Sequence, residues 1–319
     1  MSKIAKNLSL VSLLTMGSRI LGLLRDVLFF SAFGTSIFGE AFILAFTIPN
    51  LFRRMLGEGT LSSAFIPIYA EAKKKSLGLA FDLMNKVLGR LLLGLSVLIL
   101  LVVSFSYGAA QSGWFESEKW TNGSFLNSIT FSYVFFICAS AIMVGALNTR
   151  GSFLAGALSP VLLNLAMIST LAVFGLGLGW SGLHLATVLC ASVLVAGLIQ
   201  FLLPFLQLRL ADGWCWKFDL GRSEELDRIK KIFWVGAMGA AVVQINVLVS
   251  RFLAYSLDEQ GGVSYLFLAS RLIELPLGVF AIAISTVLFP ELAKAATESS
   301  PKKFMDYFFR GFRMTLAVT

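Results

Sequence analysis

Nine stretches of this sequence are apolar over roughly the length that an α-helix needs to cross a lipid bilayer. They lie at residues 8–33, 39–70, 86–110, 126–149, 156–178, 181–208, 230–256, 262–293 and 306 onward. About 20 apolar residues span the hydrocarbon core, where a backbone must satisfy its own hydrogen bonds. The pattern therefore predicts an all-α polytopic membrane protein. Eight spans are complete, and the sequence is expected to be truncated at about the ninth.

The composition excludes several other classes of protein. Hydrophobic residues make up 57% and charged residues 14% of the chain, whereas soluble domains have about 25% charged residues. The net charge of +8 is not concentrated on a polar domain, which argues against nucleic-acid binding. The three cysteines are far apart, and neither metal-binding nor nucleotide-binding nor hydrolase motifs occur. The sequence thus predicts neither an enzyme nor a bound cofactor.

The distribution of lysine and arginine predicts the orientation. If the N-terminus is cytoplasmic, 19 of the 26 basic residues fall in cytoplasmic segments, and only Lys119 falls in an outside loop. The positive-inside rule favours this arrangement. The polar segment 209–229 then becomes a cytoplasmic linker, with room for an amphipathic helix in the interface. It separates a first lobe, residues 1–208 with helices 1–6, from residues 230–319, which begin a second lobe with helices 7–9. Two six-helix halves are a common transporter plan.

Six arginines lie inside the predicted spans, where each costs about 2.5–3.5 kcal/mol if uncompensated. They are Arg19, Arg25, Arg53, Arg54, Arg251 and Arg271. Some of them, such as Arg53, Arg54 and Arg251, can alternatively extend to the interface. A guanidinium group matches phosphate oxygens in a bidentate fork and keeps its charge on burial. The cluster therefore predicts a central, water-filled cavity that binds a phosphate or pyrophosphate headgroup.

Acidic residues and helix breakers accompany these arginines. Glu40, Glu58 and Glu274 are expected either to pair with the arginines or to couple transport to protons. Asp26 follows Arg25 directly and is expected to point away from it. Arg19 and Arg25 are six residues apart, about 240° around a helix, so they share a face only if the helix bends, for which Gly22 is the candidate. Pro49 is expected to break the second span.

Four segments resemble the MurJ/MviN family of lipid II flippases. They are SRILGLLRDVLFFSAFG (18–34), EAFILAFTIPNLFRRMLGEGTLSSAFIPIYAE (40–71), SPVLLNLAMI (159–168) and SRLIELPLGVFAIAISTVLFPELAK (270–294). The resemblance implies two six-helix lobes around a central cavity, followed by two further helices. It also implies movement of lipid II, the lipid-linked peptidoglycan precursor, across the bacterial inner membrane. Membrane lipids and other cell-wall synthesis proteins are the implied partners.

The resemblance also implies roles for individual residues. Arg19, Arg25 and Arg53 match cavity arginines of the first lobe, and Arg271 matches that of the second. Ser18, Glu40 and Glu58 fall on functionally important family positions. Ser270 departs from the family, which often has an acid there. Membrane potential, Na+ or H+ each remain open as the motive force.

Three alternatives stay open at this point. A transporter of the same fold can export another polyprenyl-linked glycan or a drug, although a drug exporter would favour acids over arginines in its cavity. A membrane enzyme acting on polyprenyl phosphates would need a metal-binding acid pair or a catalytic histidine. A scaffold in cell-wall assembly would not need buried arginines.

Overall fold

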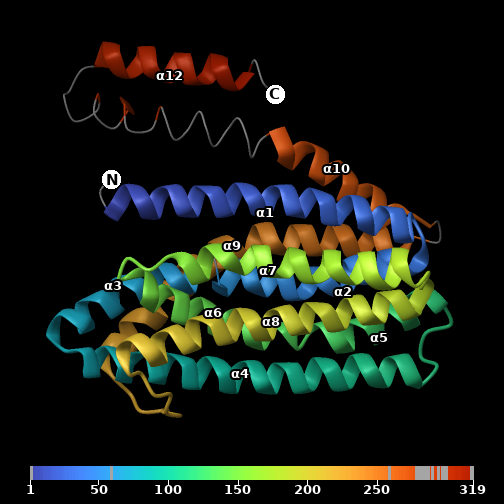
Figure 1. The fold of residues 1–319 in the computed structure, drawn as a ribbon, viewed down its shortest axis with the longest axis horizontal. Helices are drawn as coiled ribbons and strands as arrows, with labels where there is room; N and C mark the ends of the chain where they lie inside the picture. Colours follow the sequence, from blue (N-terminus) through green and yellow to red (C-terminus); the bar gives the residue numbers. More distant parts are fainter. Residues whose placement is uncertain are drawn as a thin grey trace. The chain divides into compact units, whose positions relative to one another are not determined.

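The computed structural model describes residues 3–57, 60–257, 260–276, 288, 291–292, 295 and 301–316. Every regular element among them is helical. The chain forms two compact units, Met1–Val263 and Ser264–Thr319. The first unit (Figure 1) holds α1 (Lys3–Phe33), α2 (Ile37–Phe52), the π-helix η1 (Arg53–Gly57), α3 (Thr60–Lys75), α4 (Leu77–Gln111), α5 (Glu118–Thr130), α6 (Tyr133–Asn148), α7 (Leu154–Thr170), the π-helix η2 (Leu171–Gly177), α8 (Gly182–Asp212) and α9 (Glu224–Ser256). Helix α10 (Gly262–Pro276) starts at the end of this unit, and α12 (Pro301–Leu316) lies in the second.

Five helical stretches are long and apolar enough to cross a membrane: 77–111, 118–148, 154–177, 182–212 and 224–256. They correspond to five of the predicted spans. The predicted span 39–70 is instead divided into α2, η1 and α3. Helix α1 covers the predicted span 8–33 but carries two arginines and an aspartate within it.

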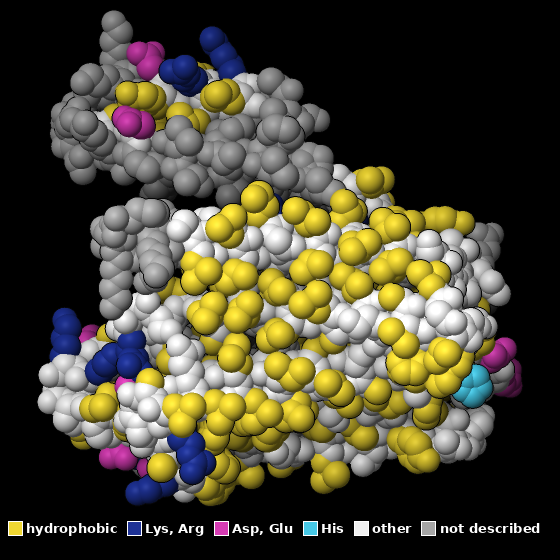
Figure 2. Space-filling view, in the orientation of Figure 1, with side chains coloured by type: hydrophobic (Ala, Val, Ile, Leu, Met, Phe, Trp, Pro, Cys, Tyr) yellow, Lys and Arg dark blue, Asp and Glu magenta, His cyan; other side chains and the backbone are white. Residues whose placement is uncertain are grey.

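The two ends of the first unit differ in charge. Figure 2 shows apolar side chains over the visible length of the first unit, with Lys and Arg gathered at one end of it. We call this end the basic end: it holds the end of α3, the start of α4, the end of α8 and the start of α9. At the opposite end lie the starts of α2 and α5 and the end of α9. An apolar body between two polar ends is the distribution expected of a bilayer-spanning bundle.

Two backbone carbonyl groups inside the bundle are satisfied by neighbouring helices. Pro49 lies within α2 and has no N–H to offer the carbonyl of Ala45. The Thr130 hydroxyl lies 3.1 Å from this carbonyl and 3.0 Å from the Leu126 carbonyl, and its one proton is shared between these two acceptors. Pro204 in α8 frees the carbonyl of Gln200 in the same way, and the Ser140 hydroxyl donates to it at 2.8 Å. Hydroxyl groups of α5 and α6 therefore replace the helix bonds that prolines remove, as a lipid environment requires.

Two predictions about the backbone need correction. Helix α2 continues through Pro49 to Phe52, and the interruption comes afterwards, at η1, because a neighbour satisfies the freed carbonyl. Helix α1 is helical throughout its length, and the bend at Gly22 stays a prediction. The linker contains no helix between residues 213 and 223, because α8 extends to Asp212 and α9 begins at Glu224. The boundary between the two compact units falls after Val263 and does not test the predicted division into lobes at 209–229. That division stays a prediction.

Candidate functional site

Arg25 is the most deeply buried arginine among the predicted site residues. It points from α1 toward α7, and only 9% of its surface is exposed. Its Nε and Nη2 donate to one carboxylate oxygen of Asp26, at 2.9 and 2.5 Å, and its Nη1 donates to the Asn164 amide oxygen at 3.0 Å. Asp26 therefore pairs with Arg25, contrary to the prediction, because the long guanidinium side chain reaches its neighbour around the helix. These contacts occupy three of the five guanidinium N–H groups.

Asn164 on α7 holds this part of α1 in place. Its amide oxygen accepts from Arg25, and its amide nitrogen donates to the Ser18 carbonyl at 3.0 Å. Gly22 lies close to Asn164, since a Cβ at residue 22 would be 3.6 Å from the Asn164 amide nitrogen. The structure thus gives Gly22 a close approach to α7, and its role as a hinge stays a prediction. Asn164 was missed as a site residue, although an asparagine inside an apolar span is itself a signal.

The other two first-lobe arginines lie apart from this cluster. Arg19 is exposed while Arg25 is buried, so the two do not share a face, as their six-residue spacing on a straight helix requires. Arg53 is half-buried in η1, where its Nε donates to the Asn50 side chain at 2.8 Å. π-Helical turns occur often at functional sites. Within the described residues, no contact joins Arg53 to Arg25.

A buried ion pair lies at the end of the first unit that is opposite to the basic end. The Glu40 carboxylate is fully buried and lies 3.1 Å from the Lys119 ammonium, while its other oxygen accepts from the Val263 backbone N–H at 2.7 Å. Lys119 also donates to the Leu257 carbonyl at 3.3 Å and stands 4.7 Å from the centre of the Tyr255 ring. Lys119 therefore belongs to a buried first turn of α5 and not to a loop, whereas its position on the outer side of the membrane stays a prediction. This cluster connects α2 and α5 to α9 and the start of α10.

Helix α9 contributes a further arginine within the first unit. Arg251 donates to the Thr47 hydroxyl on α2 at 2.6 Å, and that hydroxyl donates to the Ile43 carbonyl. Thr47 lies seven residues after Glu40, on the same face of α2. One face of α2 thus meets polar side chains of α5 and α9 over two helical turns.

The remaining predicted site residues are described only in part. Arg271 is half-buried in α10 of the second unit, with its guanidinium carbon 5.0 Å from the centre of the Phe267 ring. The side chain of Glu274 and the whole of Glu58 lie outside the described residues. The juxtaposition of Arg271 with the first-lobe arginines stays a prediction.

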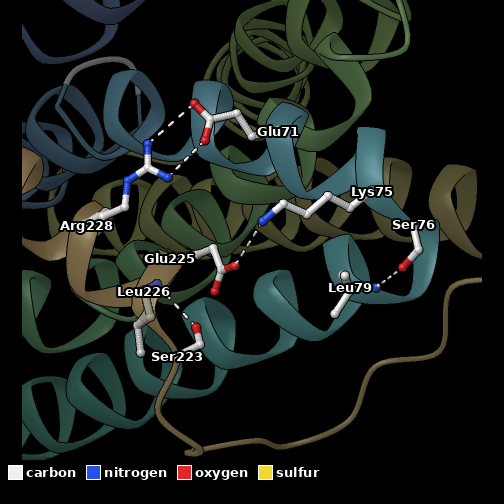
Figure 3. A network of polar contacts seen from close by, with 8 residues as sticks. All are labelled: Glu71, Lys75, Ser76, Leu79, Ser223, Glu225, Leu226 and Arg228. Carbon is white, nitrogen blue, oxygen red and sulfur yellow. Dashed lines mark hydrogen bonds and ion pairs between the residues drawn. The ribbon is translucent and has the colours of Figure 1, made fainter.

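Exposed ion pairs join α3 to α9 at the basic end (Figure 3). Arg228 of α9 donates to both oxygens of Glu71 on α3, at 2.9 and 3.4 Å, and Lys75 lies 3.9 Å from Glu225. The hydrogen bonds from Arg228 hold the pKa of the Glu71 carboxyl below its usual value. Helix α9 is thus fastened to the preceding helices at both ends, by a buried cluster at one end and by exposed pairs at the other.

A model of the lipid II flippase MurJ family matches residues 29–319. The chain belongs to this family. A probable lipid II flippase MurJ from Haemophilus influenzae is 36% identical over an alignment of 298 residues, which covers 88% of this chain and 56% of the relative. A solved structure of lipid II flippase MurJ in an inward closed conformation matches with a TM-score of 0.76 at 28% identity, covering 97% of this chain and 63% of that chain.

Membership of the MurJ family confirms the resemblance of the four sequence segments. An outward-facing multidrug resistance transporter of the MATE family, in the MOP superfamily, matches with a TM-score of 0.59 at 19% identity over 98% of this chain and 69% of that one. This second likeness shows the fold alone. Together with the helical elements above, the matches confirm the predicted all-α polytopic transporter fold. The chain spans less than two thirds of the length of the MurJ relatives just described.

Proposed function

We propose that this chain is part of a transporter that flips lipid II from the cytoplasmic to the outer leaflet by alternating access. Membership of the MurJ family supports this activity. The observation that carries the residue-level proposal is Arg25, a cation kept 9% exposed between two apolar helices. A charge at this depth is costly, and such residues mark substrate pathways in membrane proteins.

The surroundings of Arg25 fit a role in binding the diphosphate. Asp26 compensates the charge in the empty state, and Asn164 orients the guanidinium from the other side. The two N–H groups outside these contacts can donate to phosphate oxygens in a bidentate fork. A diphosphate carries more negative charge than the single Asp26 carboxylate, so it competes for the same guanidinium. Arg19, Arg53 and Arg271 complete the proposed cavity, and Ser18 lies one residue from Arg19.

Orientation and coupling belong to the same proposal. We place the N-terminus and the basic end at the cytoplasmic face of the bacterial inner membrane, since cationic segments are retained there. Opening toward the outside then requires the Glu40–Lys119 cluster to separate, and opening toward the cytoplasm requires the Arg228–Glu71 contact to loosen. Membrane potential, Na+ or H+ supplies the bias between these states.

The test is complementation of a strain depleted of its own lipid II flippase, using full-length protein variants. Arg25→Ala is expected to abolish rescue. Arg25→Lys is expected to restore it only weakly, because lysine keeps the charge but not the fork. Lys74→Ala is the matched control, since it removes an exposed cation at the end of α3. Membrane levels of each variant are measured by immunoblot.

The identity of the accumulated lipid decides the substrate. Mass spectrometry of depleted cells carrying Arg25→Ala is expected to find accumulated lipid II. Full rescue by Arg25→Ala at normal expression would refute the binding role of this arginine. Accumulation of a different polyprenyl-linked glycan, with lipid II turnover unchanged, would refute lipid II as the substrate. It would still support the proposal that the protein is a transporter.

A further inference from the structure

The segment between α8 and α9 lies as a fixed strap on α4. Gly213 ends α8 in the left-handed conformation, with φ 68°, and residues 213–223, the linker strap, follow without helical structure. The Trp214 side chain is 1% exposed, and its indole N–H donates to Asn85 at 3.1 Å. Arg90 donates to the carbonyl oxygens of Leu220 and Gly221 at 2.5 and 2.9 Å. The strap is therefore held at both of its ends.

The strap crosses α4 where the lipid-facing part of that helix begins. A Cβ at Gly89 would lie 2.6 Å from the Asp219 carbonyl oxygen, so glycine allows the strap backbone to touch the helix. One turn further along α4, about 6 Å away, Leu93 is exposed, as are Val97 and Leu100 after it. Figure 1 shows the strap extending past α4 near the basic end. The strap therefore borders the exposed apolar surface of α4 that begins at Leu93.

The strap presents large apolar side chains to the surroundings. Trp216, Phe218 and Leu220 are 44%, 57% and 45% exposed. Burying such side chains stabilises a protein, so leaving three together within five residues indicates a surface that is covered in the membrane. Aromatic residues beside lysine and arginine are typical of segments that lie at the boundary between headgroups and acyl chains.

The charges around the strap favour a negative partner. Residues 209–222 and 86–90 contain five basic and two acidic side chains: Arg209, Lys217, Arg222, Lys86 and Arg90 against Asp212 and Asp219. Both acids are engaged within the protein, Asp212 with Arg150 and Asp219 with the Gly221 backbone N–H. The two stretches together therefore carry a net charge of +3. Clusters of this kind bind anionic lipid headgroups.

We propose that the linker strap, with residues 86–90 of α4, is a binding surface for anionic phospholipid headgroups. Lys217 and Arg222 contact the headgroup phosphates, and Trp216 and Phe218 enter the upper acyl region. The surface is separate from the Arg25 site. The proposal rests on the proposed orientation in one respect only, which is that the bound lipids belong to the cytoplasmic leaflet. Because the strap leads directly into α9, lipid bound here fixes the point at which that helix enters the membrane.

Cys215 allows a direct test, since it is exposed whereas Cys138 and Cys190 are buried. Full-length protein is labelled with bimane at Cys215 and reconstituted in vesicles. The quenching lipid carries bromine near its carbonyl group and is either phosphatidylglycerol or phosphatidylcholine, at the same fraction. A Cys215→Ser protein labelled in parallel measures the signal from any other cysteine. Stronger quenching by brominated phosphatidylglycerol is expected, falling as salt screens the charges.

Charge variants separate a local site from a general effect. Lys217→Gln with Arg222→Gln is expected to lower the ratio of quenching by the two lipids to about one. Lys74→Gln with Lys231→Gln removes two exposed cations from α3 and α9, and the ratio is expected to persist. Equal quenching by both lipids in the unsubstituted protein overturns the proposal. Quenching by iodide added to the aqueous phase, without quenching by either brominated lipid, also overturns the proposal, and so does the absence of any quenching. An equal loss of lipid preference in the variant with Lys74→Gln and Lys231→Gln overturns it as well.

Discussion

The buried Glu40–Lys119 pair should be the most sensitive ion pair among those described. Replacing Lys119 with methionine leaves a fully buried carboxylate whose remaining contact is the Val263 N–H. Removing one partner of a buried pair costs about 3–5 kcal/mol, and we expect Lys119→Met to fall in this range. Glu40→Gln should cost less, because Lys119 keeps the Leu257 carbonyl and the Tyr255 ring. The double variant, which buries no charge, should be more stable than Lys119→Met alone.

The measurement is the free energy of unfolding of the full-length protein in mixed micelles with sodium dodecyl sulfate, followed by circular dichroism. Arg228→Met is the matched control: it also breaks an ion pair that fastens α9, but the side chains of Arg228 and Glu71 are 49% and 54% exposed. Surface pairs of this kind contribute little. The reasoning is refuted if Lys119→Met is no more harmful than Arg228→Met. It is equally refuted if the effects of Lys119→Met and Glu40→Gln simply add.

Three further outcomes are expected. Asn164→Leu should weaken rescue of flippase depletion while Arg25 stays in place, and rescue equal to that of the unsubstituted protein would contradict the orienting role. Trp214→Ala should cost about 3–5 kcal/mol in the same unfolding assay, because a nearly buried indole and its bond to Asn85 are lost. The lowered pKa of Glu71 means that its pairing is complete above its ordinary pKa of 4.5 and is lost as the pH falls through the lowered value. Amide exchange at the start of α9, corrected for intrinsic rates, should therefore stay constant down to about pH 5 and rise only in stronger acid; a rise near pH 6 would contradict this.

The apolar runs were sufficient to predict the fold class because backbone in lipid has few alternatives to helices. They could not show where a helix has a π-helical turn. The change from apolar Phe52 to charged Arg53 is visible in a hydropathy pattern, but it does not indicate that α2 ends between them and a π-helical turn begins. The start of α5 was missed for a related reason. Residues such as Lys119 and Asn122 indicate a loop by composition, but they are buried against other helices in this fold.

The polar site was predictable in its residue types and not in its contacts. Charge in an apolar run identified Arg25 and Glu40. Their partners Asn164 and Lys119 lie 139 and 79 positions away in the sequence, so they become neighbours only through the packing of α1 on α7 and of α2 on α5. Asp26 illustrates the opposite case: helix geometry places consecutive residues 100° apart, and a long flexible side chain overcomes that separation.

The proline–hydroxyl contacts have a consequence for how this family can vary in sequence. Thr130 serves a carbonyl that exists as an open acceptor only because residue 49 is proline, and Ser140 has the same relation to Pro204. A homologue with another residue in place of either proline regains the backbone N–H bond to the carbonyl four residues earlier. The hydroxyl group at position 130 or 140 is then no longer needed as a donor to that carbonyl. Substitutions at 49 and 130, and at 140 and 204, should therefore occur as coupled pairs among homologues, and this coupling would report helix contacts that hydropathy alone never reveals.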